Sequence, residues 1–219
     1  CWFSAKIKGK SKVLVTSRKR LGQIERIIDL NPFNFENTKE FIKEESKNRS
    51  YMIPKPFESS IRTIHKVVDG IPLAIKVLMG WLSNGLPLKQ LENKIKKSKS
   101  NILEFCFKET YENYLSEEAK LIFCALSFLP NEIAYDDIEL CMDLNSEILQ
   151  LALFELINFS LIIRVSKPLE NEDVDAYKML PLTRLFAYEK SQDFDGLERK
   201  ISKKYNKCME EKKQFKIDL

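Results

Sequence analysis

The chain has 219 residues, 44% of them hydrophobic and only six of them glycine, which indicates a folded, mostly helical protein with a sizeable core. Its 36 basic and 32 acidic side chains nearly balance, and the resulting net charge of +4 is weak evidence for a nucleic-acid partner. A single histidine, His65, excludes histidine-rich zinc sites and Ser-His-Asp triads, and we expect it to be partly buried rather than catalytic.

The first predicted element is a strand over residues 12–16, which contains a run of β-branched side chains. Directly before it, Gly9-Lys10-Ser11 has the ending of a phosphate-binding loop. A Walker A loop needs another glycine five positions earlier, where Ser4 stands, and a helix afterwards rather than a strand. We therefore exclude a Walker A loop here, and attention moves to Ser17 and Arg18 at the end of the strand.

Four helices are predicted next. Asn34 is suited to cap a helix that runs to about residue 47. Apolar residues at helical spacing predict a second helix that stops at Gly70, where glycine favours left-handed backbone. Pro72 suits the first turn of a third, strongly apolar helix. A basic amphipathic helix then leads into the polar run KIKKSKS, residues 94–100, which marks a candidate domain boundary.

The second half of the chain combines helices with two strands. Ser116 is suited to cap one helix and either Asn145 or Ser146 to cap another, and a short helix is expected between these positions. LIIRV and AYKML, residues 161–165 and 176–180, predict strands on either side of an acidic loop. Helices followed by a hairpin are typical of a winged helix-turn-helix, with a generic helical bundle carrying a surface hairpin as the alternative. Beyond Gly196, we expect a lysine- and glutamate-rich helix with a solvated face.

Packing and charge in the second half can also be predicted. We expect its core to include six apolar residues: Leu121, Ile122, Leu126, Leu151, Phe154 and Leu156. The helix over residues 146–158 contains Glu147 and Glu155 and neither lysine nor arginine. The predicted loop after it carries Glu170, Glu172, Asp173 and Asp175 against a single Lys167. Both elements would repel phosphate, so specific DNA binding is not expected.

Three motifs follow one another along these elements: Thr16-Ser17-Arg18, then Gly70-Ile71-Pro72-Leu73-Ala74, and then YKMLPLTR at residues 177–184. In this order they resemble the C-terminal part of an NB-ARC module. This is a STAND-class signal-transduction ATPase module of plant immune receptors, apoptosome scaffolds and bacterial regulators. The resemblance reaches to about Ser191, and the LPLTR variant looks more bacterial than plant-like.

The resemblance implies a mainly α fold made of several parts. Residues 1–28 would be the tail of an α/β P-loop NTPase domain. Residues 29–98 would form a small helical bundle, residues 99–190 a winged helix-turn-helix domain, and residues 191–219 the start of a following helical arm. The chain begins Cys1-Trp2-Phe3, without an initiator methionine or a signal peptide, so we expect a piece of a longer protein.

The first motif implies that Arg18, beside Thr16 and Ser17, senses the terminal phosphate of a nucleotide. A guanidinium at the end of a strand can bind phosphate bidentately. The residues alone also fit a surface arginine in a basic turn.

The second and third motifs imply different things for nucleotide binding. Gly70, Pro72 and Leu73 would lie beside the adenine, where Pro72 offers a flat apolar surface without an N–H group. The residues alone also fit an ordinary joint between two helices. Plant members carry methionine-histidine-aspartate in the third motif, whereas Leu180 stands at the histidine position here and cannot donate a hydrogen bond. No site role is therefore expected for Leu180.

The function implied by the resemblance is a nucleotide-regulated switch in signal transduction, including defence. The cofactor would be ADP or ATP, with magnesium in the full-length protein, which would be an ATPase. The Walker A and Walker B residues would precede Cys1, so the chain alone would be inactive, with neither catalytic nor metal-binding residues. Its implied partners are the upstream P-loop domain, further copies after activation, and a downstream repeat or sensor domain. Alternatives are a winged-helix DNA-binding transcriptional regulator and a structural scaffold.

The cysteines and the hydropathy of the chain indicate the cellular compartment. The five cysteines are scattered, and no two of them form a C-x-x-C pair. Cys106, Cys124 and Cys141 lie in apolar helical patterns, so we expect small core residues in a reducing environment. No uncharged run reaches the roughly 18 residues of a membrane-spanning helix. The sequence therefore predicts a soluble, cytoplasmic protein without a membrane partner.

Overall fold

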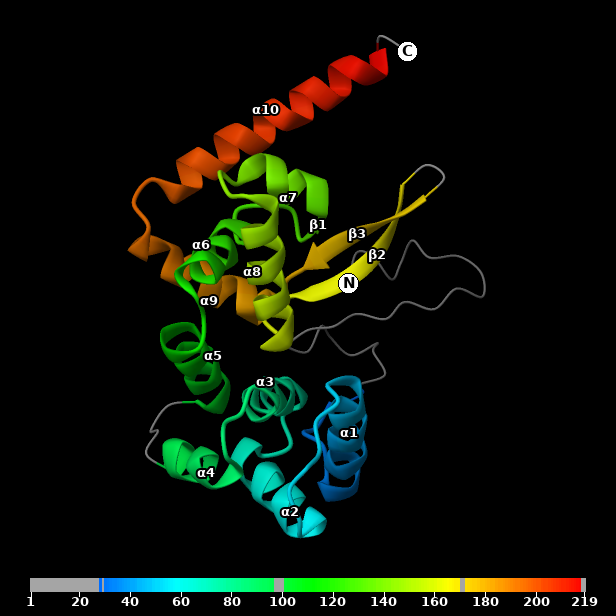
Figure 1. Ribbon diagram of the computed structural model, residues 1–219, viewed down its shortest axis with the longest axis vertical. Helices are drawn as coiled ribbons and strands as arrows, with labels where there is room; N and C mark the ends of the chain where they lie inside the picture. Colours follow the sequence, from blue (N-terminus) through cyan, green and yellow to red (C-terminus); the bar gives the residue numbers. More distant parts are fainter. Residues whose placement is uncertain (1–27, 29, 97–100, 170–171, 218–219) are drawn as a thin grey trace, which may run out of the picture. The chain divides into compact units, whose positions relative to one another are not determined.

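The helices and strands of this chain were located in a computed structural model, which describes residues 28, 30–96, 101–169 and 172–217. The chain divides into two units, Cys1–Asn31 and Pro32–Leu219. The second unit is mainly helical and contains one small antiparallel sheet (Figure 1). The mainly α composition expected from the sequence is therefore confirmed.

The second unit begins with four helices and continues with a mixed helical and β segment. In chain order the elements are α1 (Phe35–Asn48), α2 (Phe57–Val68), α3 (Pro72–Ser83), α4 (Leu88–Lys96), α5 (Ile102–Asn113), α6 (Glu117–Leu126), β1 (Glu132–Ala134), α7 (Tyr135–Cys141), α8 (Ser146–Asn158), β2 (Ile163–Leu169), β3 (Glu172–Lys178), α9 (Pro181–Lys190), η2 (Ser191–Asp193) and α10 (Leu197–Ile217).

Local capping explains where several helices begin. The Asn34 side chain accepts a hydrogen bond from the Asn37 N–H, and the Ser116 hydroxyl accepts one from the Ala119 N–H. Asn145 caps α8 in the same way. Each cap satisfies an N–H group that has no partner inside its helix. The helix starts predicted at these three positions are confirmed.

The sheet has the strand order β1-β3-β2, and both pairs are antiparallel. Its hairpin extends further than the sequence indicated, because β2 continues to Leu169 and β3 begins at Glu172. Arg164 on β2 donates to Asp175 on β3 at 2.8 and 2.5 Å, so one predicted loop carboxylate pairs across the strands. Strand β1 was not predicted, because three residues carry no recognisable pattern without their partner strand.

Two apolar helices lie at the centre of the packing. Helix α3 is buried along most of its length and contacts α1, α2 and α5. Helix α6 is buried from Ile122 to Leu126 and contacts α8, α9 and α10. A helix that is apolar on every side requires neighbours around it. Helices α3 and α6 are therefore surrounded by the other elements.

One part of the predicted core is wrong. Leu151 and Phe154 on α8 have 63% and 62% of their surface exposed. The buried face of α8 consists of Leu149, Ala152, Leu153 and Leu156. Because leucine and phenylalanine occur on every side of this helix, periodicity did not identify the side that faces α6. Of the remaining predicted residues, Ile122, Leu126 and Leu156 are buried and Leu121 is half-buried.

Helix α10 has one buried face in addition to the solvated face that was expected. Leu197, Ile201 and Cys208 are buried, and the helix lies against α7 (Figure 1). Three lysines of α10 also form ion pairs with the α7 region: Lys200 and Lys204 with Asp143, and Lys212 with Asp137. The apolar face and these ion pairs together fix α10 on α7.

The cysteines within the described ranges are buried and free. Burial raises the pKa of the Cys106 thiol to about 12 and that of Cys124 to about 11. A thiol with a raised pKa stays protonated and behaves as a small apolar core residue. The prediction that Cys106, Cys124 and Cys141 are core residues is confirmed. Across the part of the chain that the structure describes, no helix has the length and apolar character needed to cross a bilayer.

Candidate functional site

The turn between α2 and α3 contains one of the predicted nucleotide-binding motifs. Asp69 and Gly70 both have left-handed backbone, with φ of 50° and 67°. The Phe33 N–H donates to the Gly70 carbonyl at 2.8 Å, and a Cβ atom on Gly70 would lie 2.1 Å from the Phe33 carbonyl oxygen. No side chain fits at that distance. Glycine is therefore required here by the close approach of the two backbones.

Pro72 and Leu73 follow this turn at the start of α3. Both are half-buried, and Leu73 packs against the core. The helix N-cap is Ile71, whose apolar side chain makes no capping hydrogen bond. The turn thus brings Gly70, Pro72 and Leu73 together and leaves part of an apolar proline surface accessible. The predicted positions Thr16, Ser17 and Arg18 lie outside the described residues.

His65 has a structural role. Its Nδ1 atom lies 2.8 Å from the hydroxyl of Thr38, a fully buried residue on α1. The His65 ring also contacts Phe35 edge-on, with centroids 5.8 Å apart. These contacts tie α2 to α1. The half-buried histidine expected from the sequence is confirmed.

The third motif stabilises the turn that follows a helix. The Arg184 guanidinium on α9 donates to the carbonyls of Ser127 and Leu129 at 2.8 and 2.7 Å, and to the Pro130 carbonyl at 3.2 Å. These carbonyls belong to the turn that follows α6, so Arg184 holds this turn against α9. Burial lowers the pKa of Arg184. The sequence carried no signal for this role, because the acceptors lie 54 to 57 residues away.

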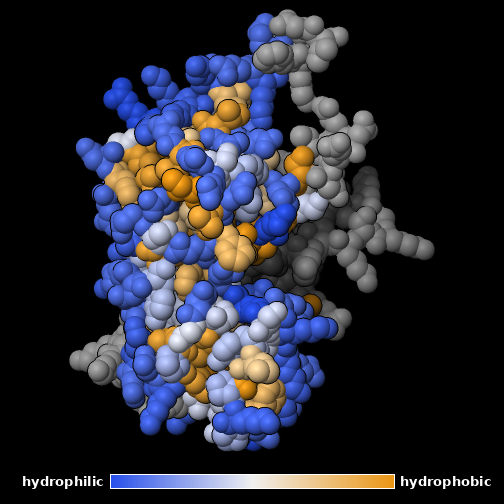
Figure 2. Space-filling model, viewed as in Figure 1, coloured by the Kyte–Doolittle hydropathy of each residue, from blue (hydrophilic) through white to orange (hydrophobic). Residues whose placement is uncertain are grey.

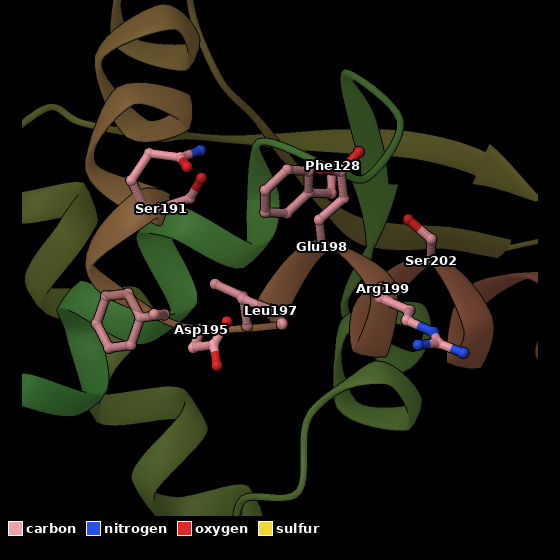
Figure 3. A pocket seen from close by; sticks show the side chains of 10 residues that line it. Phe128, Ser191, Asp195, Leu197, Glu198, Arg199 and Ser202 are labelled. Atoms are coloured by element: carbon pink, nitrogen blue, oxygen red, sulfur yellow. The ribbon is translucent and has the colours of Figure 1, made fainter.

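A cavity of about 480 Å³ lies where η2 meets α10 (Figure 3). Its lining mixes Phe128 and Phe194 with charged residues, and Asp195 and Arg199 lie on two different sides of it (Figure 3). The Ser191 hydroxyl is already used, since it donates to the Tyr188 carbonyl at 2.6 Å. The residues that line this cavity come from elements other than the α2–α3 turn.

The outward face of α8 is apolar. Ile148, Leu151 and Phe154 are exposed there, and Figure 2 shows hydrophobic side chains gathered over this helix. Glu147 is exposed on the same helix, and Glu155 is half-buried and bonds to the N–H and hydroxyl of Ser116. A face of this composition offers no cation to a phosphate.

Gly80 on α3 is a further position that sequence analysis passed over. A Cβ atom there would lie 2.6 Å from the Asn158 carbonyl oxygen and 3.2 Å from the Phe159 Cα. The signal was available, because an isolated glycine within an apolar helix often marks a close approach of another backbone. The approaching backbone is the end of α8.

Within the described segments, no three histidine, cysteine, aspartate or glutamate side chains are grouped so that they could hold a metal ion. No protein-family model matches the chain, and a search of curated proteins finds no match either.

Proposed function

We propose that this chain is the regulatory part of a nucleotide switch of the NB-ARC type. The observation that carries the proposal is the order of its elements. A helix, a strand, two helices and a two-stranded hairpin follow one another from α6 to β3, and the last strand lies in the middle of the sheet. This order supports a winged helix-turn-helix, in which α7 and α8 would form the helix-turn-helix and β2 and β3 would form the wing.

The segment before this winged helix supports the same proposal. Helices α1 to α4 form a small bundle whose α2–α3 turn presents Gly70, Pro72 and Leu73. In the proposed switch, Pro72 and Leu73 face the adenine of ADP or ATP, and Arg18, with Thr16 and Ser17, faces the terminal phosphate. The bundle and the winged helix then act as a lever whose position depends on the bound nucleotide.

The remaining components of the switch would come from the rest of the protein. An upstream P-loop domain would supply the phosphate-binding lysine and the acids that hold magnesium. ATP hydrolysis, assembly of further copies and a downstream repeat or sensor domain belong to that larger protein. ADP would hold the lever against the P-loop domain, and exchange for ATP would release it for assembly in the cytoplasm, as in defence signalling.

Nucleotide titrations test this function. The isolated chain should bind ADP weakly or not at all and should lack ATPase activity. In the full-length protein, Arg18→Ala should lower the affinity for ATP relative to that for ADP by about tenfold or more. The reason is that a charge-assisted hydrogen bond is worth about 1.5–3 kcal/mol. Pro72→Ala should lower the affinities for ADP and ATP by the same factor.

Calorimetry on the full-length protein measures both effects, and Arg62→Ala is the matched control. Arg62 is an exposed arginine on α2 that pairs with Glu58 at 3.0 Å. Its replacement by alanine should leave the affinities for both nucleotides unchanged. If Arg18→Ala left the ADP affinity and the ATP affinity at their wild-type values, Arg18 would not be the nucleotide sensor. Absence of any nucleotide binding by the full-length protein would refute the proposed function.

The winged-helix order also suits a DNA-binding transcriptional regulator, and charge distinguishes the two functions. The helix that would enter the major groove is α8, which contains no lysine or arginine among its residues. On the adjacent hairpin, Arg164 is already paired with Asp175. We therefore expect no specific DNA binding. A sequence-dependent, salt-sensitive shift of duplex DNA that is lost on mutating α8 would establish the regulator instead.

A further inference from the structure

One of the polar contacts between the helical bundle and the winged-helix segment is made by an arginine. Arg49 follows the last turn of α1, and its side chain is 14% exposed. Its Nη1 atom donates to the Asn158 carbonyl at 2.5 Å, and its Nη2 atom donates to the Ser160 hydroxyl at 2.8 Å. Both acceptors lie at the C-terminal end of α8. A cation is favourable there because the last carbonyls of a helix lack partners and carry partial negative charge.

The bundle holds Arg49 in position from the other side. Arg49 Nε donates to the buried Glu45 carboxylate at 3.2 Å, and Nη2 also reaches the Lys76 carbonyl at 3.4 Å. The Lys76 ammonium lies 3.5 Å from the same carboxylate. The guanidinium therefore has two acceptors in the bundle, on α1 and α3, and two more at the C-terminal end of α8. A planar group with five N–H donors is suited to such a junction, and lysine is not.

The two backbones also touch directly beside Arg49. The hydrogen of Gly80 on α3 faces the Asn158 carbonyl, and no larger group fits there. Ser160 has left-handed backbone, with φ of 58°. This residue belongs to the turn that ends α8, where its N–H donates to the Ile157 carbonyl and its hydroxyl accepts from Arg49. The strain of left-handed backbone in a non-glycine residue persists only where its surroundings hold it in place.

We propose that Arg49 is a latch that makes the bundle (residues 32–96) and the winged-helix segment (residues 101–190) move as one lever. When the latch opens, the aromatic contact between Trp81 and Tyr114 remains, with ring centroids 5.6 Å apart, and the two parts rock about it. The separating surfaces at Arg49 are polar, so water replaces the lost hydrogen bonds. The role of the lever rests on the proposed function, whereas the coupling itself needs no nucleotide.

The test is a distance measurement between spin labels on the two parts of this chain, made without nucleotide. Ser59→Cys on α2 and Glu189→Cys on α9 place the labels at exposed positions. Cys1→Ser removes a native thiol that could also be labelled. The other four native cysteines are buried. Arg49→Ala should broaden the distance distribution while circular dichroism stays unchanged. Arg62→Ala, an exposed arginine of the same bundle, should leave the distribution narrow.

Two additional variants separate a latch from a general effect on folding. Arg49→Lys should give an intermediate width, because an ammonium cannot contact all four acceptors together. If Arg49→Ala fails to fold, Ser160→Ala removes a single latch acceptor and should still broaden the distribution. An unchanged narrow distribution in the folded Arg49→Ala or Ser160→Ala variant overturns the proposal. Nucleotide binding plays no part in this result, so the latch and the proposed function can fail independently.

Discussion

Replacing Trp81 with alanine is expected to lower the free energy of unfolding by about 3–5 kcal/mol. Trp81 is fully buried in α3, stacks on Tyr114 and contacts Phe105 edge-on. Its indole N–H donates to the hydroxyl of Thr110, also fully buried, at 2.9 Å. The substitution removes the ring contacts, leaves a cavity and takes away the hydrogen bond that joins α3 to α5.

Urea unfolding monitored by circular dichroism measures this loss, provided that the slope against denaturant is unchanged. Trp81→Phe is the control, because it keeps an aromatic ring but removes the N–H group. It should be clearly less destabilising than alanine, with the lost hydrogen bond contributing about 0.5–1.5 kcal/mol. If Trp81→Ala lowered the stability by less than about 0.5 kcal/mol, as a surface substitution does, α3 would not be packed as described.

The second large effect is expected at α8. Leu153→Ala should lower the free energy of unfolding by about 2–5 kcal/mol, because Leu153 is 1% exposed and lies on the face that packs on α6. The mutation removes buried methyl groups and leaves a cavity that neighbouring side chains fill only in part.

Leu151→Ala is the matched control on the same helix. Leu151 is 63% exposed, so its loss should change stability by no more than about 0.5 kcal/mol. Thermal unfolding of the two variants under the same conditions compares them directly. A larger effect at Leu151 than at Leu153 would mean that α8 is rotated about its axis relative to this structure.

Much of the helical framework could be predicted because short-range interactions determine it. Asn34, Ser116 and Asn145 accept hydrogen bonds from N–H groups two or three residues later. The turn at Gly70 and the proline after it follow from equally local backbone preferences. These features need no knowledge of the rest of the fold, and the structure places them where the sequence indicated.

The candidate site was predictable only in part, for a related reason. The α2–α3 turn brings Gly70, Pro72 and Leu73 together because they are neighbours in sequence. The latch could not be predicted, since Arg49 and its Asn158 acceptor are 109 residues apart. Arg184 and its three acceptors after α6 pose the same difficulty. An arginine's charge is visible in a sequence, but the carbonyl that it will meet is not.

The sequence by itself determined that this protein is mainly helical, where most helices begin, and that Cys106, Cys124 and Cys141 are buried. These properties depend on capping, proline and glycine geometry and average hydrophobicity, which act within a few residues. Only the tertiary structure decided which side of α8 is buried, that residues 132–134 form a strand, and that α10 packs on α7. Each of those outcomes depends on the partner that a segment meets, and an apolar helix or a three-residue strand does not specify that partner.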